Sequence, residues 1–286
     1  GGGDSEPGPG TTKFPPLPQH GSSSSLSVSV SSSHLTALFE RVPALHQVMH
    51  KVLARITEMP RSRLLGRKQV LLVASGAFNP IHKLHLRMLY IARKYLEECT
   101  ELEVLGGFVS PQHATVVRSR YRAVPREIIP PKHRLAMARA AVGDSTWLTV
   151  DPWEITRRRV MDYLSVLEHV DQVLEACFPG LGVKIIWLCN ADALMQLSPE
   201  DLRARGHGCL CVCRPQETDR LLQHMGLRWR QVAYVVEDAA ILSRDLEATT
   251  STRVRQAAVD LATHGPGPVE GGGGGGGGGG GSGAGG

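Results

Sequence analysis

Long apolar runs are missing from this chain of 286 residues. No stretch approaches the ~18 consecutive apolar residues that a membrane-spanning helix needs, so we expect no membrane partner. A strong excess of one charge is missing as well, because 32 Lys and Arg against 27 Asp and Glu leave a net charge of +5. That mild surplus suits anionic substrates but is far from the charge of a typical nucleic-acid-binding protein, so no nucleic-acid partner is expected.

Paired cysteines are also missing. None of the six cysteines forms a CxxC pair and no signal peptide is evident, which favours reduced intracellular thiols. The run CLCVC at residues 209–213 could form a metal or redox cluster. Its cysteines recur at every second position within an apolar run, which favours a buried strand that uses Cys as a small hydrophobic residue. The Ser-rich, acid-poor start resembles a transit peptide but lacks the arginines, so we expect a cytoplasmic or nuclear location with organelle targeting left open.

Low-complexity segments bound the part of the chain that can fold. Residues 1–34 are rich in Gly, Pro and Ser, and residues 265–286 run into polyglycine, so we expect both to be disordered. Residues 35–66 form a helical extension with Pro43 in it, followed by a linker, RSRLLGRK. We expect the extension to pack on the domain, and a partner-binding helix is the alternative. We expect the linker to be solvated, and a nuclear-import signal is the alternative for it. Residues 67–264 are then one domain.

Apolar runs and helical patterns alternate through this domain, which predicts βαβ units and a parallel sheet. The expected strands are residues 69–74, 103–109, 147–150, 183–188, 208–213 and 232–236. The expected helices are residues 82–98, 131–142, 158–177, 191–197, 217–225 and 250–262. The predicted fold class is therefore α/β, a Rossmann-like doubly wound parallel sheet. In such sheets ligands bind at the carboxyl ends of the strands.

The stretch VLLVASGAFNPIHKLHL shows what happens at the end of the first strand. Gly76 permits close approach of the backbone to a ligand, and Pro80 can fix the start of the helix. The free N–H groups of the helix N-terminus form a phosphate site, and His82 and His85, three residues apart, share one helix face above it. The dinucleotide signature GxGxxG and the Walker P-loop are both absent, and a zinc site would need a third ligand that the sequence does not place.

The string GAFNPIHKLH resembles the GxFxPxHxxH signature of the nucleotidylyltransferase superfamily. The further stretches LEVLGGFVSP, PPKHRLAMA, VDPWE, WLCNADAL and TTSTRVR occur in the order seen in eukaryotic nicotinamide-mononucleotide adenylyltransferases. The resemblance covers about residues 70–257 and is greatest for the plant-type members. It implies a single nucleotidyltransferase domain that joins ATP to nicotinamide or nicotinate mononucleotide in NAD biosynthesis, releasing pyrophosphate.

The resemblance also implies an ATP site and the residues that catalyse the transfer. The backbone of the first turn, the second histidine, a basic residue after the SP turn and the TSTRVR motif correspond to the family's ATP-binding positions. These residues are Gly76, Ala77, Phe78, His85, Arg118, Ser251, Thr252, Arg253 and Arg255. Catalysis is expected of His85, His82 and Arg253. Ser251 and Thr252 are also good helix N-caps, which is the alternative reason for their presence.

The mononucleotide site is implied by a second group of matches. Trp153 corresponds to the tryptophan that stacks on the nicotinamide ring, with Thr156 beside it, and Asp192 to the aspartate that holds ribose hydroxyls. Asn190 departs from the family's Gly, and Arg214 corresponds to a basic residue of the cleft. Because no Trp follows between Asp192 and Cys209, we hypothesise that Arg214 lets the acid mononucleotide be used at least as well as the amide.

The expected chemistry is in-line attack of the mononucleotide phosphate on the α-phosphate of ATP, without a covalent enzyme intermediate. Mg²⁺ is expected to arrive with ATP, because no dedicated protein metal site is evident. We also expect a homo-oligomer. Two alternatives stay open: a sibling nucleotidylyltransferase with another substrate, and a degenerate homologue that acts as a nucleotide-binding or chaperone module.

Overall fold

The computed structural model describes residues 43–239 and 250–264. The predicted disordered ends, and the part of the predicted helical extension before Pro43, lie outside the described residues. Among the helices within the described ranges, none combines the length and apolarity that crossing a bilayer requires.

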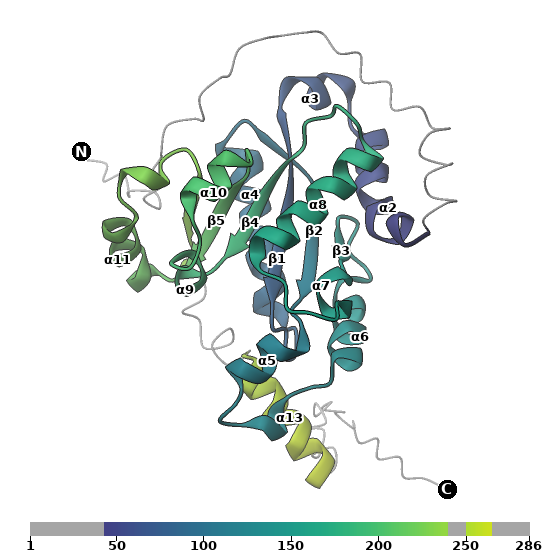
Figure 1. Ribbon diagram of the computed structural model, residues 1–286, viewed down its shortest axis with the longest axis vertical. Helices are drawn as coiled ribbons and strands as arrows, with labels where there is room; N and C mark the ends of the chain where they lie inside the picture. Colours follow the sequence, from purple (N-terminus) through teal and green to yellow (C-terminus); the bar gives the residue numbers. More distant parts are fainter. Residues whose placement is uncertain (1–42, 240–249, 265–286) are drawn as a thin grey trace, which may run out of the picture.

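The centre of the molecule is a parallel sheet of six strands in the order β3-β2-β1-β4-β5-β6 (Figure 1). The strands are β1 (Lys68–Gly76), β2 (Leu102–Pro111), β3 (Leu148–Val150), β4 (Lys184–Cys189), β5 (Gly208–Cys213) and β6 (Ala233–Glu237). The chain builds outward from β1 to β3 and then returns to the other side of β1 at β4. This reversal confirms the predicted doubly wound topology and leaves a crevice between the carboxyl ends of β1 and β4.

Helices connect the strands and cover both faces of the sheet (Figure 1). Those before β4 are α2 (Pro43–Glu58), α3 (Arg61–Gly66), α4 (Lys83–Cys99), α5 (Ala114–Arg120), α6 (Pro131–Val142), α7 (Trp153–Thr156) and α8 (Tyr163–Cys177). Those after it are α9 (Ala191–Leu194), α10 (Pro199–Ala204), α11 (Pro215–Met225) and α13 (Ser251–His264), and the short turns η1 (Pro125–Glu127) and η2 (Leu227–Trp229) complete the described elements.

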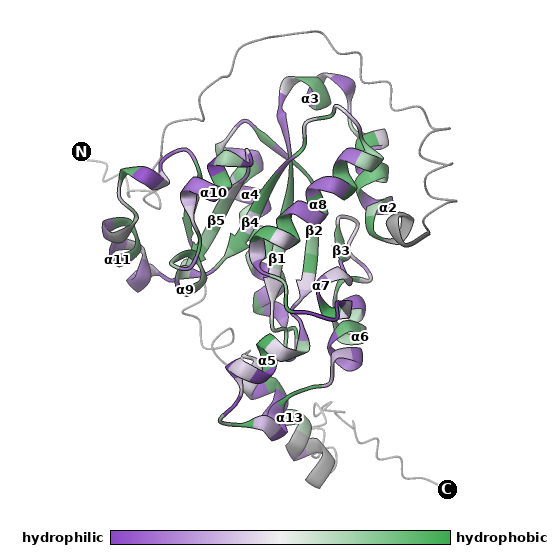
Figure 2. Ribbon diagram, in the orientation of Figure 1, coloured by the Kyte–Doolittle hydropathy of each residue, from purple (hydrophilic) through white to green (hydrophobic). Residues whose placement is uncertain are grey.

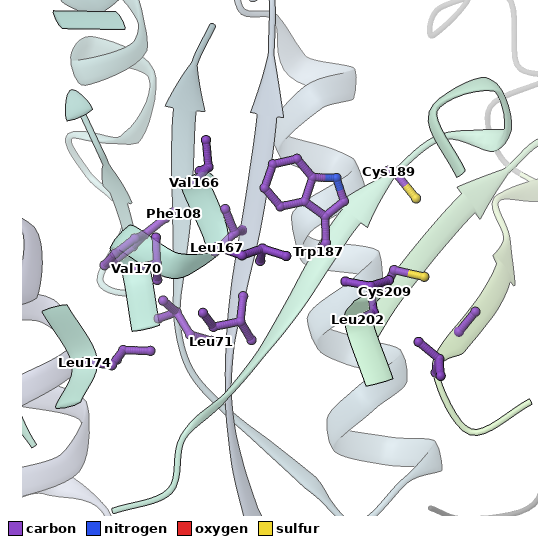
Figure 3. Packing of buried hydrophobic residues seen from close by; sticks show 14 of the residues in the cluster. Leu71, Phe108, Val166, Leu167, Val170, Leu174, Trp187, Cys189, Leu202 and Cys209 are labelled. Atoms are coloured by element: carbon purple, nitrogen blue, oxygen red, sulfur yellow. The ribbon is translucent and has the colours of Figure 1, made fainter. Parts of the chain in front are cut away.

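Alternation along the strands divides the core into two layers. In β1, Leu71 and Val73 pack toward α2 and α8, whereas Val70 and Leu72 pack toward α4 and α6. Figure 3 shows the first layer, with apolar side chains of α8 against the strands, and Figure 2 shows that the strands are mostly apolar while the helices mix polar and apolar residues. Burying each such aliphatic side chain contributes roughly 1.5–3 kcal/mol, which makes this sheet a rigid support for the loops at its carboxyl edge.

Residues 61–66 of the predicted linker RSRLLGRK form helix α3, a short helix with no buried residue between α2 and β1. Two of the linker's arginines pair with a buried acid: Arg63 lies 2.7 Å and Arg67 3.3 Å from the carboxylate of Glu103 on β2, and Arg55 of α2 lies 2.8 Å from the same carboxylate. Glu103 is completely buried, so α2 and α3 are tied into the domain by three charges around one carboxylate.

Two predicted helices differ from the structure by more than two residues at one end, and each difference has a cap as its cause. Helix α8 begins at Tyr163 rather than at residue 158, because the Asp162 carboxylate accepts a hydrogen bond from the Ser165 N–H at 2.8 Å. The helix predicted at 191–197 ends at Leu194, and Ser198 starts a new helix by accepting from the Asp201 N–H at 3.1 Å. Helix α5 was not predicted at all.

Candidate active site

A cleft of about 700 Å³ opens at the carboxyl edge of the sheet, between β1 and β4. Seven of the predicted site residues line it: Gly76, Ala77, Phe78, His85, Asn190, Asp192 and Ser251. They come from segments up to 175 positions apart (251 − 76), and the carboxyl ends of the strands bring them together. The remaining predicted residues lie outside this lining and are described in turn below.

The turn after β1 forms the floor of the cleft. A Cβ atom on Gly76 would lie 3.1 Å from the Phe78 ring, so a side chain at residue 76 would push this ring by a few tenths of an ångström. Phe78 itself has a φ of 39°, in the left-handed region that non-glycine residues seldom adopt. The turn is therefore a fixed and tightly packed loop whose backbone faces the ligand space.

His85 stands at the start of α4, with its ring against two other rings. The imidazole of His82 stacks on it at 3.7 Å, and the Phe78 ring meets it edge-on at 5.0 Å. The His82 backbone N–H donates to Nδ1 of His85 at 3.2 Å, which places the ring proton on Nε2. Burial, together with the neighbouring His82, lowers the pKa of His85 to about 3, and burial lowers the pKa of His82 to about 4.

Both rings are therefore neutral at pH 7. His85 is thus a neutral hydrogen-bond donor at the start of a helix, while the His82 ring stacks on it from outside the cleft lining. The N–H groups of the first turn of α4 and its dipole add positive potential at the same place.

Asn190 and Asp192 follow β4 and line the opposite side of the cleft. The Asn190 side chain accepts a hydrogen bond from the Ala193 N–H at 2.9 Å and so caps α9. The departure from Gly at this position is thus explained by a helix cap. Both residues are exposed at the cleft mouth, where the Asp192 carboxylate is available to hydroxyl groups of a ligand.

Arg118 is not the arginine that faces the cleft. It lies on the outer side of α5, where its guanidinium donates to the Thr115 hydroxyl at 2.9 Å and lines a smaller cleft of about 350 Å³. Arg120 and Tyr121 line the main cleft in its place. Residues two apart on a helix point in nearly opposite directions, so the two arginines cannot share one site.

The TSTRVR motif starts α13, as its cap-forming residues suggest. Ser251 reaches the cleft and donates from its hydroxyl to the Pro80 carbonyl at 3.0 Å. Arg255 is held away from it by an ion pair with Glu127 (Nε to Oε2, 3.0 Å) and a hydrogen bond to the Asn79 carbonyl at 2.7 Å.

The other two predicted site residues of this motif stay at the surface. Thr252 and Arg253 are exposed, and neither lines the cleft. The Arg253 backbone N–H donates to the Thr250 hydroxyl at 3.3 Å, so Thr250 is the helix cap.

Trp153 has a protein partner for its ring. His169 of α8 stacks on the indole at 4.4 Å with an angle of 7° between the planes, and the Arg157 guanidinium lies 5.1 Å from the ring centre. Thr156 turns its hydroxyl back to the carbonyls of Pro152 and Trp153. Neither Trp153 nor Thr156 lines the main cleft.

The aromatic side chains that do line the cleft near β4 are Tyr163 and Trp187, with ring centres 6.0 Å apart. Sequence reasoning missed both, because Trp187 lies within an apolar strand and Tyr163 at a helix start. Arg214 is exposed at the N-cap of α11 and lies outside the cleft lining. The acid preference that rested on Arg214 therefore has no support from the lining residues.

The cysteine run forms strand β5, as its period of two predicted. Cys209, Cys211 and Cys213 are buried free thiols, and burial raises the pKa of Cys209. Within residues 43–239 and 250–264, no group of three or more His, Cys, Asp or Glu side chains could hold a metal ion.

Comparison with known proteins agrees with this geometry. The cytidylyltransferase-like family matches residues 73–257, from the end of β1 to α13. A nicotinamide/nicotinic acid mononucleotide adenylyltransferase of Arabidopsis thaliana is 33% identical over 155 residues, which are 51% of this chain and 62% of the relative. A protein of Saccharomyces cerevisiae named nicotinamide/nicotinic acid mononucleotide adenylyltransferase 2 is 29% identical over 223 residues, 68% of this chain and 55% of its own length.

A protein of that same name from Danio rerio is 39% identical over 103 residues, or 36% of this chain and 32% of the relative. The matched region thus spans between about a third and under two thirds of these relatives. The family model covers well over half of the present sequence and includes every strand of the sheet except the first residues of β1. The chain therefore belongs to the cytidylyltransferase-like family.

Proposed function

We propose that this protein transfers the adenylyl group of ATP to nicotinamide or nicotinate mononucleotide, giving a dinucleotide and pyrophosphate. The observation that carries the proposal is the cleft at the β1–β4 reversal. There the Gly76–Phe78 turn, the neutral His85 at a helix N-terminus and Arg120 meet Asp192, which suits a ligand with phosphates at one end and a ribose at the other. The relatives that match this region are named for that transfer.

In this mechanism the protein positions the two substrates and stabilises phosphate charge. The mononucleotide phosphate attacks the α-phosphorus of ATP, the bond to the bridging oxygen breaks, and pyrophosphate leaves with the electron pair. A phosphate monoester is already ionised near pH 7, so no residue must remove a proton from it. His85 donates from Nε2 and Arg120 adds a full positive charge, while Ser251 keeps α13 against the turn after β1.

A divalent cation fits this scheme as a companion of ATP. The cleft lining contains one carboxylate, Asp192, and the described residues offer no cluster of protein ligands, so the ion's other ligands would be phosphate and water oxygens. When bound, such an ion neutralises charge on the phosphates of ATP.

A substrate panel tests the proposal. The purified protein is given ATP or CTP with nicotinamide mononucleotide, nicotinate mononucleotide, a phosphorylated alcohol or 4′-phosphopantetheine, and pyrophosphate release is measured. We expect turnover with ATP and either mononucleotide only. Turnover with CTP or with another acceptor would identify a sibling transferase, and ATP binding without any turnover would support the binding module.

The same panel measures the acid preference. Arg120 is the one ionised cation in the described cleft lining and lies on the side of the phosphate-binding turn. We therefore expect kcat/KM for the acid and amide mononucleotides to agree within about ten-fold, and Arg214→Ala to leave their ratio unchanged.

A further inference from the structure

A buried arginine lies beneath the turn after β1. Arg134 of α6 is completely buried, although burial lowers the pKa of its guanidinium and so opposes its charge. Nη1 donates to the Ala77 carbonyl at 2.7 Å and Nη2 donates to the Gln112 carbonyl at 2.9 Å. No ion pair joins it to a carboxylate of the described residues. A charge buried at this cost is unexplained by packing alone.

A buried carboxylate also ties the same two segments together. Glu154 of α7 is 2% exposed, and its Oε2 accepts from the Ser75 hydroxyl at 2.8 Å while Oε1 faces the His113 N–H at 3.4 Å. Burial raises the pKa of Glu154, and its negative charge favours the charged form of Arg134. Ser75 precedes the turn after β1 and His113 follows β2.

These contacts determine which backbone groups face an anionic ligand in the main cleft. Ser75, Gly76, Ala77 and Gln112 all line the main cleft. Free carbonyl oxygens of the turn would repel phosphates, but those of Ala77 and Gln112 are each occupied by a guanidinium N–H. The Gly76 carbonyl is occupied too, because it accepts from the Gln112 N–H at 2.9 Å. Three carbonyl oxygens at the floor of the cleft thus already accept hydrogen bonds from the protein, and the positive charge of the Arg134 guanidinium lies directly behind them.

We propose that Arg134 is a positioning residue for the phosphate-binding part of the cleft, assisted by Glu154. Arg134 does not touch substrate; it holds the turn after β1 and the segment after β2 at a fixed separation and turns their carbonyls from the phosphates toward itself. The inference rests on the proposed function for its kinetic test, and on ATP binding alone for an independent one.

Four variants test this role. Arg134→Ala removes both hydrogen bonds and the charge, Arg134→Lys keeps the charge but cannot reach both carbonyls in the same fork, and Glu154→Gln keeps the shape of the carboxylate partner. Arg139→Ala is the matched control, an exposed arginine on the same helix. We expect kcat/KM to fall about 100-fold in Arg134→Ala and about ten-fold in Arg134→Lys, with the control unchanged, because small displacements of a phosphate site cost this much.

Chemical rescue separates positioning from general stability. The smaller cleft of about 350 Å³ reaches Arg134 from the side of α5 and η1, so methylguanidine can enter the space left in Arg134→Ala. Millimolar methylguanidine should raise kcat/KM of Arg134→Ala at least ten-fold, and it should have no effect on His85→Ala. Absence of rescue in a folded Arg134→Ala protein, or near-normal kcat/KM in Arg134→Lys and Arg134→Ala, would overturn the proposal.

Calorimetric titration with ATP keeps the two proposals distinguishable. If wild-type protein binds ATP without transferring it, the proposed function fails, yet Arg134→Ala should still bind ATP at least ten-fold more weakly than Arg139→Ala. Equal ATP affinity in these two variants would refute the positioning role whatever the reaction. Should Arg134→Ala not fold, Arg134→Lys and Glu154→Gln decide the matter by the same titration.

Discussion

His85 is the side chain whose position most directly ties one residue to the chemistry. It lines the cleft with Nε2 free to donate, whereas His82 lies outside the cleft lining, where its ring stacks on His85 and its backbone N–H donates to Nδ1 of His85. We therefore expect His85→Ala to reduce kcat by about 10²–10³-fold, as loss of a donor to transition-state charge does elsewhere. His82→Ala is the matched control and should lose far less, because alanine retains the backbone N–H. Near-normal turnover in folded His85→Ala would contradict this role.

The two histidines also predict how stability depends on pH. Their folded pKa values of about 3 and about 4 lie below the ordinary 6.5, so the unfolded chain binds more protons as the pH falls below about 6.5. The free energy of unfolding should therefore decrease between pH 7 and pH 4, by at most about 1.4 kcal/mol per pH unit for each ring. Urea unfolding of wild type and the double variant His82→Asn/His85→Asn measures this. Equal pH slopes would show that the rings are not neutral in the fold.

Single residues also mark where sequence reasoning reached its limit. The GAFNPIHKLH string is local, so Gly76, Phe78 and His85 could be placed at one site from sequence alone. The stacking of His169 on Trp153 joins two helices through tertiary packing, and no pattern in the sequence encodes it. Arg255 likewise fits its motif, but Glu127 and Asn79 hold it from positions 128 and 176 residues away.

At the scale of elements, helix α5 decides which arginine meets the ligand. Arg120 lines the cleft, while Arg118 faces the other way and bonds to Thr115. In the proposed function, Arg120 donates a charge-assisted hydrogen bond to a phosphate of the substrate. Losing such a bond costs about 1.5–3 kcal/mol, so Arg120→Ala should raise the KM for a phosphate-bearing substrate at least about ten-fold. Arg118→Ala, the matched control from the same helix, should change KM little. A larger effect from Arg118 than from Arg120 would refute this orientation of α5.

The strands were predictable as elements, whereas several helices were not. Continuous apolar runs bounded by turn residues identify strands buried on both faces, and all six predicted strands occur in the structure. Helix α5 has no apolar stripe of any length, and the division between α9 and α10 depends on the Ser198 cap. Ser198 is visible in the sequence, but the periodicity of apolar residues alone does not identify it as a helix cap.

At the scale of the whole molecule, the Glu103 cluster joins the extension to the domain far from the cleft. Glu103 pairs in register with Gln69 near the start of β1, at the opposite end of the strand from the Gly76 turn. Glu103→Gln leaves Arg55, Arg63 and Arg67 without their shared charge and should lower the free energy of unfolding by roughly 2 kcal/mol.

Urea unfolding measures this change against Glu98→Gln, an exposed acid on α4, as the control. The turnover of the folded fraction should be unaffected by Glu103→Gln, because the cluster lies away from the carboxyl edge of the sheet. Unchanged stability would mean that the three ion pairs contribute nothing to the attachment of α2 and α3.

The central claim is that this one cleft carries out direct adenylyl transfer, and the fate of the α-phosphate tests it most directly. Protein is incubated with ATP labelled at the α-phosphate and nicotinamide mononucleotide, and label is followed in the dinucleotide, in pyrophosphate and on the protein. The account predicts label in the dinucleotide alone, at a rate that His85→Ala and Arg120→Ala both reduce. Label that stays in ATP, or that is trapped on the protein, would contradict it.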